Sequence, residues 1–197
     1  MKFNYFLFLA ATAAILTACG GGGGDAPASA SANSGSATSF ATYVGTYKTG
    51  CQTLNLNQTV GNRYSYIYTV VVSADGNVTG KEEEFDAPAS ISAPCVPSYL
   101  VSDVTVIGTA FLLGTTKNIT AAKSTKTGVA QLANFNYRGF KLSKGLLSNF
   151  GTIPMDGATT KIGFLVEGSQ VYVLSGSRKS STDGLPDSFS SNVLVKQ

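Results

Sequence analysis

The chain contains no histidine among its 197 residues. Histidine supplies the general base in Ser-His-Asp triads and Cys-His pairs, and it is a frequent ligand of zinc and haem iron. Its absence therefore removes most hydrolase chemistry and the histidine-based metal sites. The groups that remain for chemistry are three cysteines, a run of carboxylates and a row of tyrosines.

The carboxylates are densest in the segment EEEFD, from Glu82 to Asp86. On a strand, Glu82 and Glu84 share one face and Glu83 points to the other. A glycosidase needs two carboxylates across a cleft, about 5 Å or about 7–9 Å apart, and a weak cation site is a further alternative. We favour a solvated or edge-protecting strand, because charges on an edge strand deter pairing with other chains.

Two further motifs have simpler interpretations. Lys-Thr-Gly at 48–50 and 126–128 resembles one motif of the serine β-lactamases, but those enzymes also need Ser-x-x-Lys, and no serine here precedes a lysine by three positions. The segment 183–187 (DGLPD) lacks the alternating oxygen ligands of an EF-hand and is interpreted as a surface turn. The sequence therefore predicts no catalytic residue, no metal site and no cofactor.

The first twenty residues resemble the signal peptides of bacterial lipoproteins. Lys2 precedes an apolar run at 6–16, which is too short for a hydrocarbon core of about 30 Å but typical of a signal peptide. Leu16-Thr17-Ala18-Cys19 is similar to a lipobox, which implies removal of residues 1–18 and acylation of Cys19. Two or three acyl chains anchor a protein stably. An ordinary signal peptide with an incidental cysteine is the alternative.

Residues 19–39 are expected to form a tether. The segment is almost entirely Gly, Ala and Ser, so it cannot bury enough apolar surface to fold. A flexible coil of about 20 residues spans roughly 25 Å on average. Gly20 follows the cysteine, and in this lipoprotein class a residue other than Asp there implies the outer membrane. We therefore expect a domain at 40–197 held beside that membrane, with the lipid anchor as its membrane contact.

The other two cysteines form an even pair once Cys19 is acylated. In the oxidising envelope compartment that the lipobox implies, Cys51 and Cys95 are expected to form a disulfide. The bridge closes about 45 residues, for which the chain-entropy model gives roughly 4 kcal/mol. Two free buried thiols are the alternative.

The domain shows a period of two, which predicts strands. Tyr64, Tyr66 and Tyr68 share one face with the two valines that follow at alternate positions, and Asp75-Gly76 predicts a hairpin turn into a partner strand at 77–85. Further strands are predicted at 99–113, 118–122, 129–141, 161–166, 170–175 and 185–195, with one helix candidate at 144–150. Glu167-Gly168-Ser169 predicts a second hairpin turn, between the strands at 161–166 and 170–175.

Many short strands with turn signals between them predict an all-β barrel or sandwich. The segments YVGTYKTGC (43–51) and KIGFLVEGSQVYVLSG (161–176) resemble the first and last strands of small lipocalin-like barrel lipoproteins. Tyr47 stands where the G-x-W motif of lipocalins has Trp. The resemblance implies an antiparallel up-and-down barrel of about eight strands, and a β-sandwich is the alternative.

These features favour a non-enzymatic envelope lipoprotein that binds a small apolar ligand or an envelope partner. Tyr64, Tyr66 and Tyr68 either line a ligand pocket or fill the core, and we favour the core. A net charge of +3 without basic runs argues against nucleic acid. One alternative is a surface-exposed protein that binds a host or neighbouring protein, because the glycine-rich tether resembles that of factor H-binding and transferrin-binding lipoproteins. Another is a structural lipoprotein without a ligand.

Overall fold

The computed structural model describes residues 40–53, 62–121, 124–145, 156–175 and 183–197. These ranges contain nine strands and two short 3-10 helices, so the described chain is all-β as expected. The predicted signal peptide, lipidated cysteine and tether lie outside them. The elements are η1 (Phe40–Tyr43), β1 (Gly45–Lys48), β2 (Gln52–Thr53), β3 (Asn62–Val72), β4 (Asn77–Pro88), η2 (Pro97–Tyr99), β5 (Leu100–Ile119), β6 (Gly128–Lys144), β7 (Thr159–Glu167), β8 (Gln170–Val173) and β9 (Leu194–Lys196).

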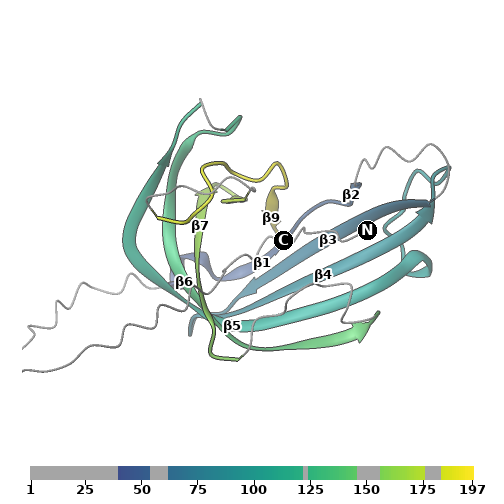
Figure 1. Cartoon of the computed structure of the whole chain (residues 1–197), viewed down its shortest axis with the longest axis horizontal. Coiled ribbons are helices and arrows are strands. Elements are labelled where there is room, and N and C mark those ends of the chain that lie inside the picture. The colour runs from purple at the N-terminus through teal and green to yellow at the C-terminus, as the bar shows by residue number, and fades with distance from the viewer. Residues whose placement is uncertain (1–39, 54–61, 122–123, 146–155, 176–182) are drawn as a thin grey trace, which may run out of the picture.

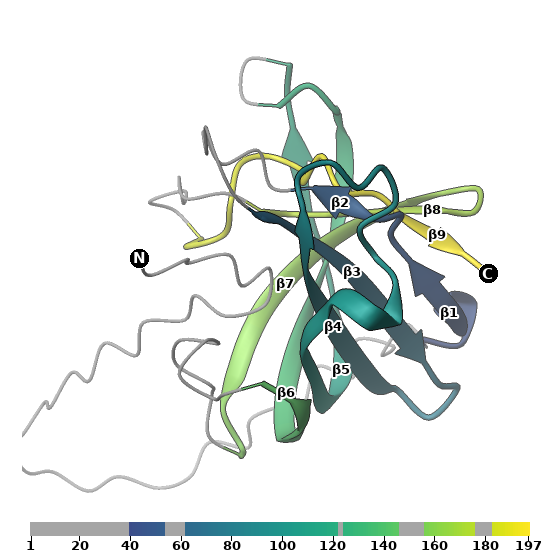
Figure 2. The ribbon, with the colours of Figure 1, turned by 90° about the vertical axis from the view of Figure 1, so that its right-hand side faces the viewer.

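The strands form one antiparallel sheet that closes in a ring. From β2 to β9 each strand pairs with the next one along the chain, and β1 pairs with both β9 and β3. The long strands β3 to β6 curve through the molecule (Figure 1), and the short strands β1, β8 and β9 lie side by side and complete the ring (Figure 2). Because the side-chain period is two, each strand sends alternate residues inward.

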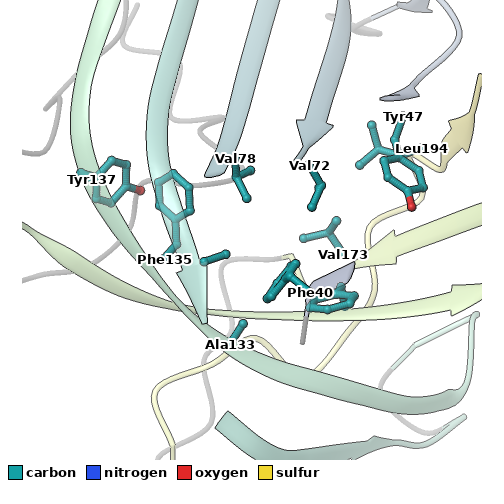
Figure 3. Close-up of a cluster of buried hydrophobic side chains, with 11 residues drawn as sticks. Phe40, Tyr47, Val72, Val78, Ala133, Phe135, Tyr137, Val173 and Leu194 are labelled. Carbon is teal, nitrogen blue, oxygen red and sulfur yellow. The ribbon is translucent and has the colours of Figure 1, made fainter. Parts of the chain in front are cut away.

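The main hydrophobic core fills the inside of this ring. Phe40 of η1 packs there, 9% exposed, so the helix that precedes β1 contributes to the core although it belongs to no strand. Tyr47 is buried and its hydroxyl donates to the carbonyl of Tyr43 at 2.8 Å. The other buried members come from β3 to β9: Val72, Val78, Ala110, Ala133, Phe135, Tyr137, Phe164, Val173 and Leu194 (Figure 3).

Two predicted hairpins are confirmed. Gly76 has φ +81°, and the amide of Asn77 donates to the side chain of Asp75 at 3.1 Å. Gly168, with φ +58°, connects β7 to β8. The predicted strands at 99–113 and 118–122 are instead one strand, β5, because an irregularity in its pairing between Leu112 and Thr116 accommodates Gly114. The helix candidate at 144–150 is wrong at its first residue, because Lys144 is the last residue of β6. Residues 146–150 of this candidate lie outside the described ranges.

The predicted closing strand at 185–195 is wrong over most of its length. In this region the described chain forms β9 at the end and isolated bridges at Pro186 and at Phe189, of which the latter pairs with Leu174. Leu185 and Phe189 pack with Ile119 and neighbouring side chains in a second, smaller core. Lys117 of β5 contacts Asp183 at 2.9 Å and Asp187 at 3.0 Å. The segment is thus attached to the ring by a lysine and apolar side chains, while its proline removes one donor that a strand would need.

The predicted disulfide is confirmed. Cys51 and Cys95 are bonded, with their Cα atoms 5.8 Å apart and a sequence separation of 44. Cys51 lies between β1 and β2, and Cys95 lies in the connection from β4 to β5. The bond therefore ties that connection to the opening strands of the ring.

Candidate functional site

The tyrosine row lies on the inner face of β3, where the apolar core gives way to polar side chains. Val70 and Tyr68 pack against the main core. The rings of Tyr66 and Tyr68 lie 5.0 Å apart between centroids, and the Tyr66 hydroxyl accepts a hydrogen bond from Nδ2 of Asn192 at 2.7 Å. Exposure rises along this face from 8% at Val72 to 39% at Tyr64. The row therefore runs from the core towards solvent, and its members do not share one environment.

Glu82 and Glu84 lie on the same inner face, directly across from two of these tyrosines. Glu82 is the cross-strand partner of Tyr68, and Glu84 is the partner of Tyr66. The Tyr68 hydroxyl donates to Oε1 of Glu82 at 3.3 Å. The expectation of a solvated or edge-protecting strand is therefore wrong, because β4 pairs with β3 on one side and β5 on the other.

Burial changes the ionisation of Glu82 and Glu84, which together form an acidic cluster, and of the neighbouring Tyr68. Loss of solvation raises the pKa of Glu82 to about 8, with a further contribution from the charge of Glu84. Burial also raises the pKa of Glu84. The pKa of Tyr68 is raised as well, first by burial and then by the neighbouring Glu82. A carboxyl with a pKa of about 8 is mostly protonated at neutral pH, so the cluster carries less negative charge than its composition indicates.

The inner and outer carboxylates differ in their partners. On the outer face, Lys81 pairs with Glu83 at 2.9 Å and with Asp103 at 3.2 Å. On the inner face, no lysine or arginine whose side chain the structure describes lies within ion-pair distance of Glu82 or Glu84. A buried carboxylate without a cation is costly, and this cost explains the raised pKa of both groups.

An apolar cavity of about 70 Å³ lies in the adjoining core. Phe40 and Tyr43 of η1 line one side, and Val70 and Val78 of the long strands line another. Figure 3 shows the Phe40 ring between the side chains of the surrounding strands, close to Val173. Further lining residues come from β1, β5 and β7 to β9: Tyr47, Ala110, Ile162, Gly163, Phe164, Val166, Val171, Val173 and Leu194.

The cavity and the acidic cluster adjoin along one strand. Val78, Gly80 and Glu82 occupy alternate positions of β4 and thus face inward together, at intervals of about 7 Å. A Cβ atom added to Gly80 would meet no atom within 4 Å. Glycine thus leaves open space on the inner face between the cavity-lining Val78 and the carboxyl of Glu82.

The sequence pattern predicts only part of this site. Alternation places the three tyrosines on one face and the two glutamates on one face, but it does not bring the two sets together. Phe40 is not predicted, because an isolated aromatic residue after a glycine-rich segment carries no periodic signal. Ser102 was missed for a similar reason. Its alternation with Val104 and Val106 was visible in the sequence, but its position opposite Glu84 depends on strand register.

The two inner glutamates do not form the pair of carboxylates that a glycosidase needs. Glu82 and Glu84 lie side by side on one strand and do not face each other across a cleft, as a glycosidase pair must. Within the described ranges, no group of three or more acidic or cysteine side chains is placed to hold a metal ion. Of the helices in the same ranges, none has the length and apolar character needed to cross a membrane.

Comparisons with protein-family models, with curated proteins and with solved structures each find no match to this chain.

Proposed function

We propose that the chain is a non-enzymatic lipoprotein of the outer membrane whose ring of strands is a lipocalin-like barrel that binds a small apolar ligand. The anchor is supported by the lipobox-like segment at 16–19 and by the glycine-rich residues that follow it. The barrel is supported by the order of the strands, since each of β3 to β8 pairs with the next strand along the chain and β1 closes the ring.

The observation that carries the ligand proposal is the apolar cavity beside Phe40. Its volume of about 70 Å³ is below the roughly 150 Å³ of an engineered cavity that binds benzene. It is also far below the 300–1,000 Å³ of pockets for drug-sized ligands. The cavity as it stands fits a short alkyl segment, and a longer chain requires the Phe40 ring to move.

Ligand uptake is tested with octanol and the full chain in lipid nanodiscs, with empty nanodiscs as the blank. Ala110 lines the cavity, so Ala110→Leu should fill it and abolish the binding heat, whereas Phe40→Ala should enlarge it and increase affinity. Val129→Leu is the matched control, because Val129 is 49% exposed and does not line the cavity. Melting curves verify that each variant is folded. No octanol binding by either wild type or Phe40→Ala would favour the structural alternative.

The anchor is tested separately by Cys19→Ser. Without acyl chains this variant should be released or misprocessed, because acylation is the only anchor we propose. Cell fractionation and the intact mass of the mature chain provide the measurement. Membrane retention with an unchanged mass would contradict the lipid assignment.

A second candidate function is binding of a protein partner on the outer face of β5. Ile107 and Phe111 point outward there and are 44% and 53% exposed. Photo-crosslinking from position 111 in intact cells tests this candidate, and position 195 is a control on a different strand with an exposed valine. A specific adduct from position 111 alone would support the partner interpretation. Adducts from neither position would remove it.

A further inference from the structure

A buried hydroxyl, that of Ser102, lies beside the acidic cluster inside the ring. Ser102 is 0% exposed, and its Oγ has no hydrogen-bond partner among the residues that the structure describes. It is the cross-strand partner of Glu84 and shares the inner face with Val106, which packs on the main core. A buried hydroxyl without a partner costs free energy. Its place beside Glu84 therefore indicates that a polar group from outside the chain belongs there.

The chemistry of the surrounding side chains selects a cation. Glu82 and Glu84 offer carboxylate oxygens with no lysine or arginine of the described ranges beside them, and Tyr66 and Tyr68 add two aromatic rings. Ammonium groups are attracted both to carboxylates and to aromatic faces. The geometry also leaves room for an apolar tail, because a Cβ placed at Gly80, between Glu82 and the cavity-lining Val78 on β4, would meet no atom within 4 Å.

We propose that the ring binds a cationic amphiphile of the alkylammonium class, with its chain in the apolar cavity and its ammonium group between Glu82 and Glu84. This inference rests on the proposed ligand-binding function and names the chemical class of the ligand. The ammonium group lies towards the end of β3 where Tyr64 is exposed, and the chain points towards Phe40.

The proposal predicts coupling between binding and proton release. The titratable groups on this inner face are Tyr64, Tyr66 and Tyr68 on β3 and Glu82, Glu84 and Asp86 on β4, whereas β5 contributes Ser102 and Val104. Glu82 is mostly protonated at neutral pH because burial raises its pKa to about 8. An ammonium group stabilises the ionised form, so close to one proton should leave per ligand bound at about pH 7.

The test is calorimetry of the full chain in zwitterionic nanodiscs with three ligands that share one alkyl chain: octylammonium, octanol and octanoate. We expect octylammonium to bind about ten-fold or more tightly than octanol, and octanoate to bind more weakly than either. Titrations in two buffers with different ionisation heats measure proton release, which should accompany octylammonium but not octanol. This measurement needs no variant.

Glu82→Gln and Glu84→Gln should each remove most of the preference for octylammonium while keeping octanol binding. Glu83→Gln is the matched control, because this carboxylate points outward and pairs with Lys81. Equal affinities of wild type for octylammonium and octanol, without proton release, would overturn the cation site and leave the apolar site intact. Absence of binding by all three ligands would overturn the proposed ligand-binding function itself.

Discussion

The hydroxyl of Tyr68 donates a hydrogen bond to Oε1 of Glu82 at 3.3 Å inside the ring of strands. The two residues are direct partners on β3 and β4. Val70 and Val78, which line the cavity, lie on one side of this pair, and Glu84 lies on the other. The contact therefore marks the boundary between the apolar cavity and the acidic cluster.

Stability should fall as the pH rises through neutrality. The pKa of Glu82 is about 8 in the folded chain, above its ordinary value of 4.5, so the folded state holds the proton more tightly. The stability from this group is full below about pH 4.5 and is lost as the pH rises through about 8. We expect a loss of a few kcal/mol between about pH 5 and about pH 8.5, measured by urea unfolding.

Variants can show which carboxyl group causes this pH dependence. Glu82→Gln should flatten most of the slope, and a residual slope of the same sign should remain because the pKa of Glu84 is also raised. Glu83→Gln, on the outer face, should keep the slope. The same slope in Glu82→Gln as in wild type would show that Glu82 does not hold its proton in the folded chain.

Truncation should separate two members of the tyrosine row. Tyr66 is half-buried, packs against the ring of Tyr68 and accepts a hydrogen bond from Asn192, so Tyr66→Ala should cost about 2 kcal/mol. Tyr64 is 39% exposed, and Tyr64→Ala should cost about 0.5 kcal/mol. Thermal unfolding measures both. Equal losses would mean that the two side chains are equally buried, contrary to the gradient along β3.

Removal of the disulfide should destabilise the domain by about 4 kcal/mol, because the bond closes a loop of 44 positions. The variant to measure is Cys51→Ala with Cys95→Ala, which leaves no unpaired thiol at the site. Reduction of wild type should lower stability by a similar amount, and reduction of the double variant should change nothing. A double variant as stable as oxidised wild type would contradict a stabilising role.

Lys117 should be critical for attaching the C-terminal segment. Its side chain is 11% exposed and contacts both Asp183 and Asp187, so Lys117→Met leaves two carboxylates without their cation. The expected loss is about 3 kcal/mol. Lys126→Met is the matched control, because its partner Glu167 is 46% exposed, and it should cost less than about 1 kcal/mol. Similar losses for the two variants would show that burial does not strengthen the Lys117 contacts.

The acidic cluster shows what the local sequence pattern can and cannot predict. The alternation of residues 82–84 predicts correctly that Glu82 and Glu84 share a face. It does not tell which face is inside, because a run of glutamates is typical of solvated strands. The outcome depends on β3 and β5 pairing on either side of β4, and those contacts join residues far apart in the chain. The predicted closing strand at 185–195 fails for a related reason, since Lys117, 70 positions before Asp187, contacts Asp187 within this segment and Asp183 just before it.

The sequence by itself determined the all-β class, the Asp75-Gly76 and Gly168 turns and the pairing of Cys51 with Cys95. Each depends on short-range periodicity, on the backbone freedom of glycine or on the count of the two cysteines that remain when Cys19 is assigned to the lipid anchor. The tertiary structure alone decided that β1 closes the ring, that Phe40 lies inside it and that the cavity adjoins Glu82. These features depend on strand register and on packing between distant segments, which leave no periodic trace in the sequence.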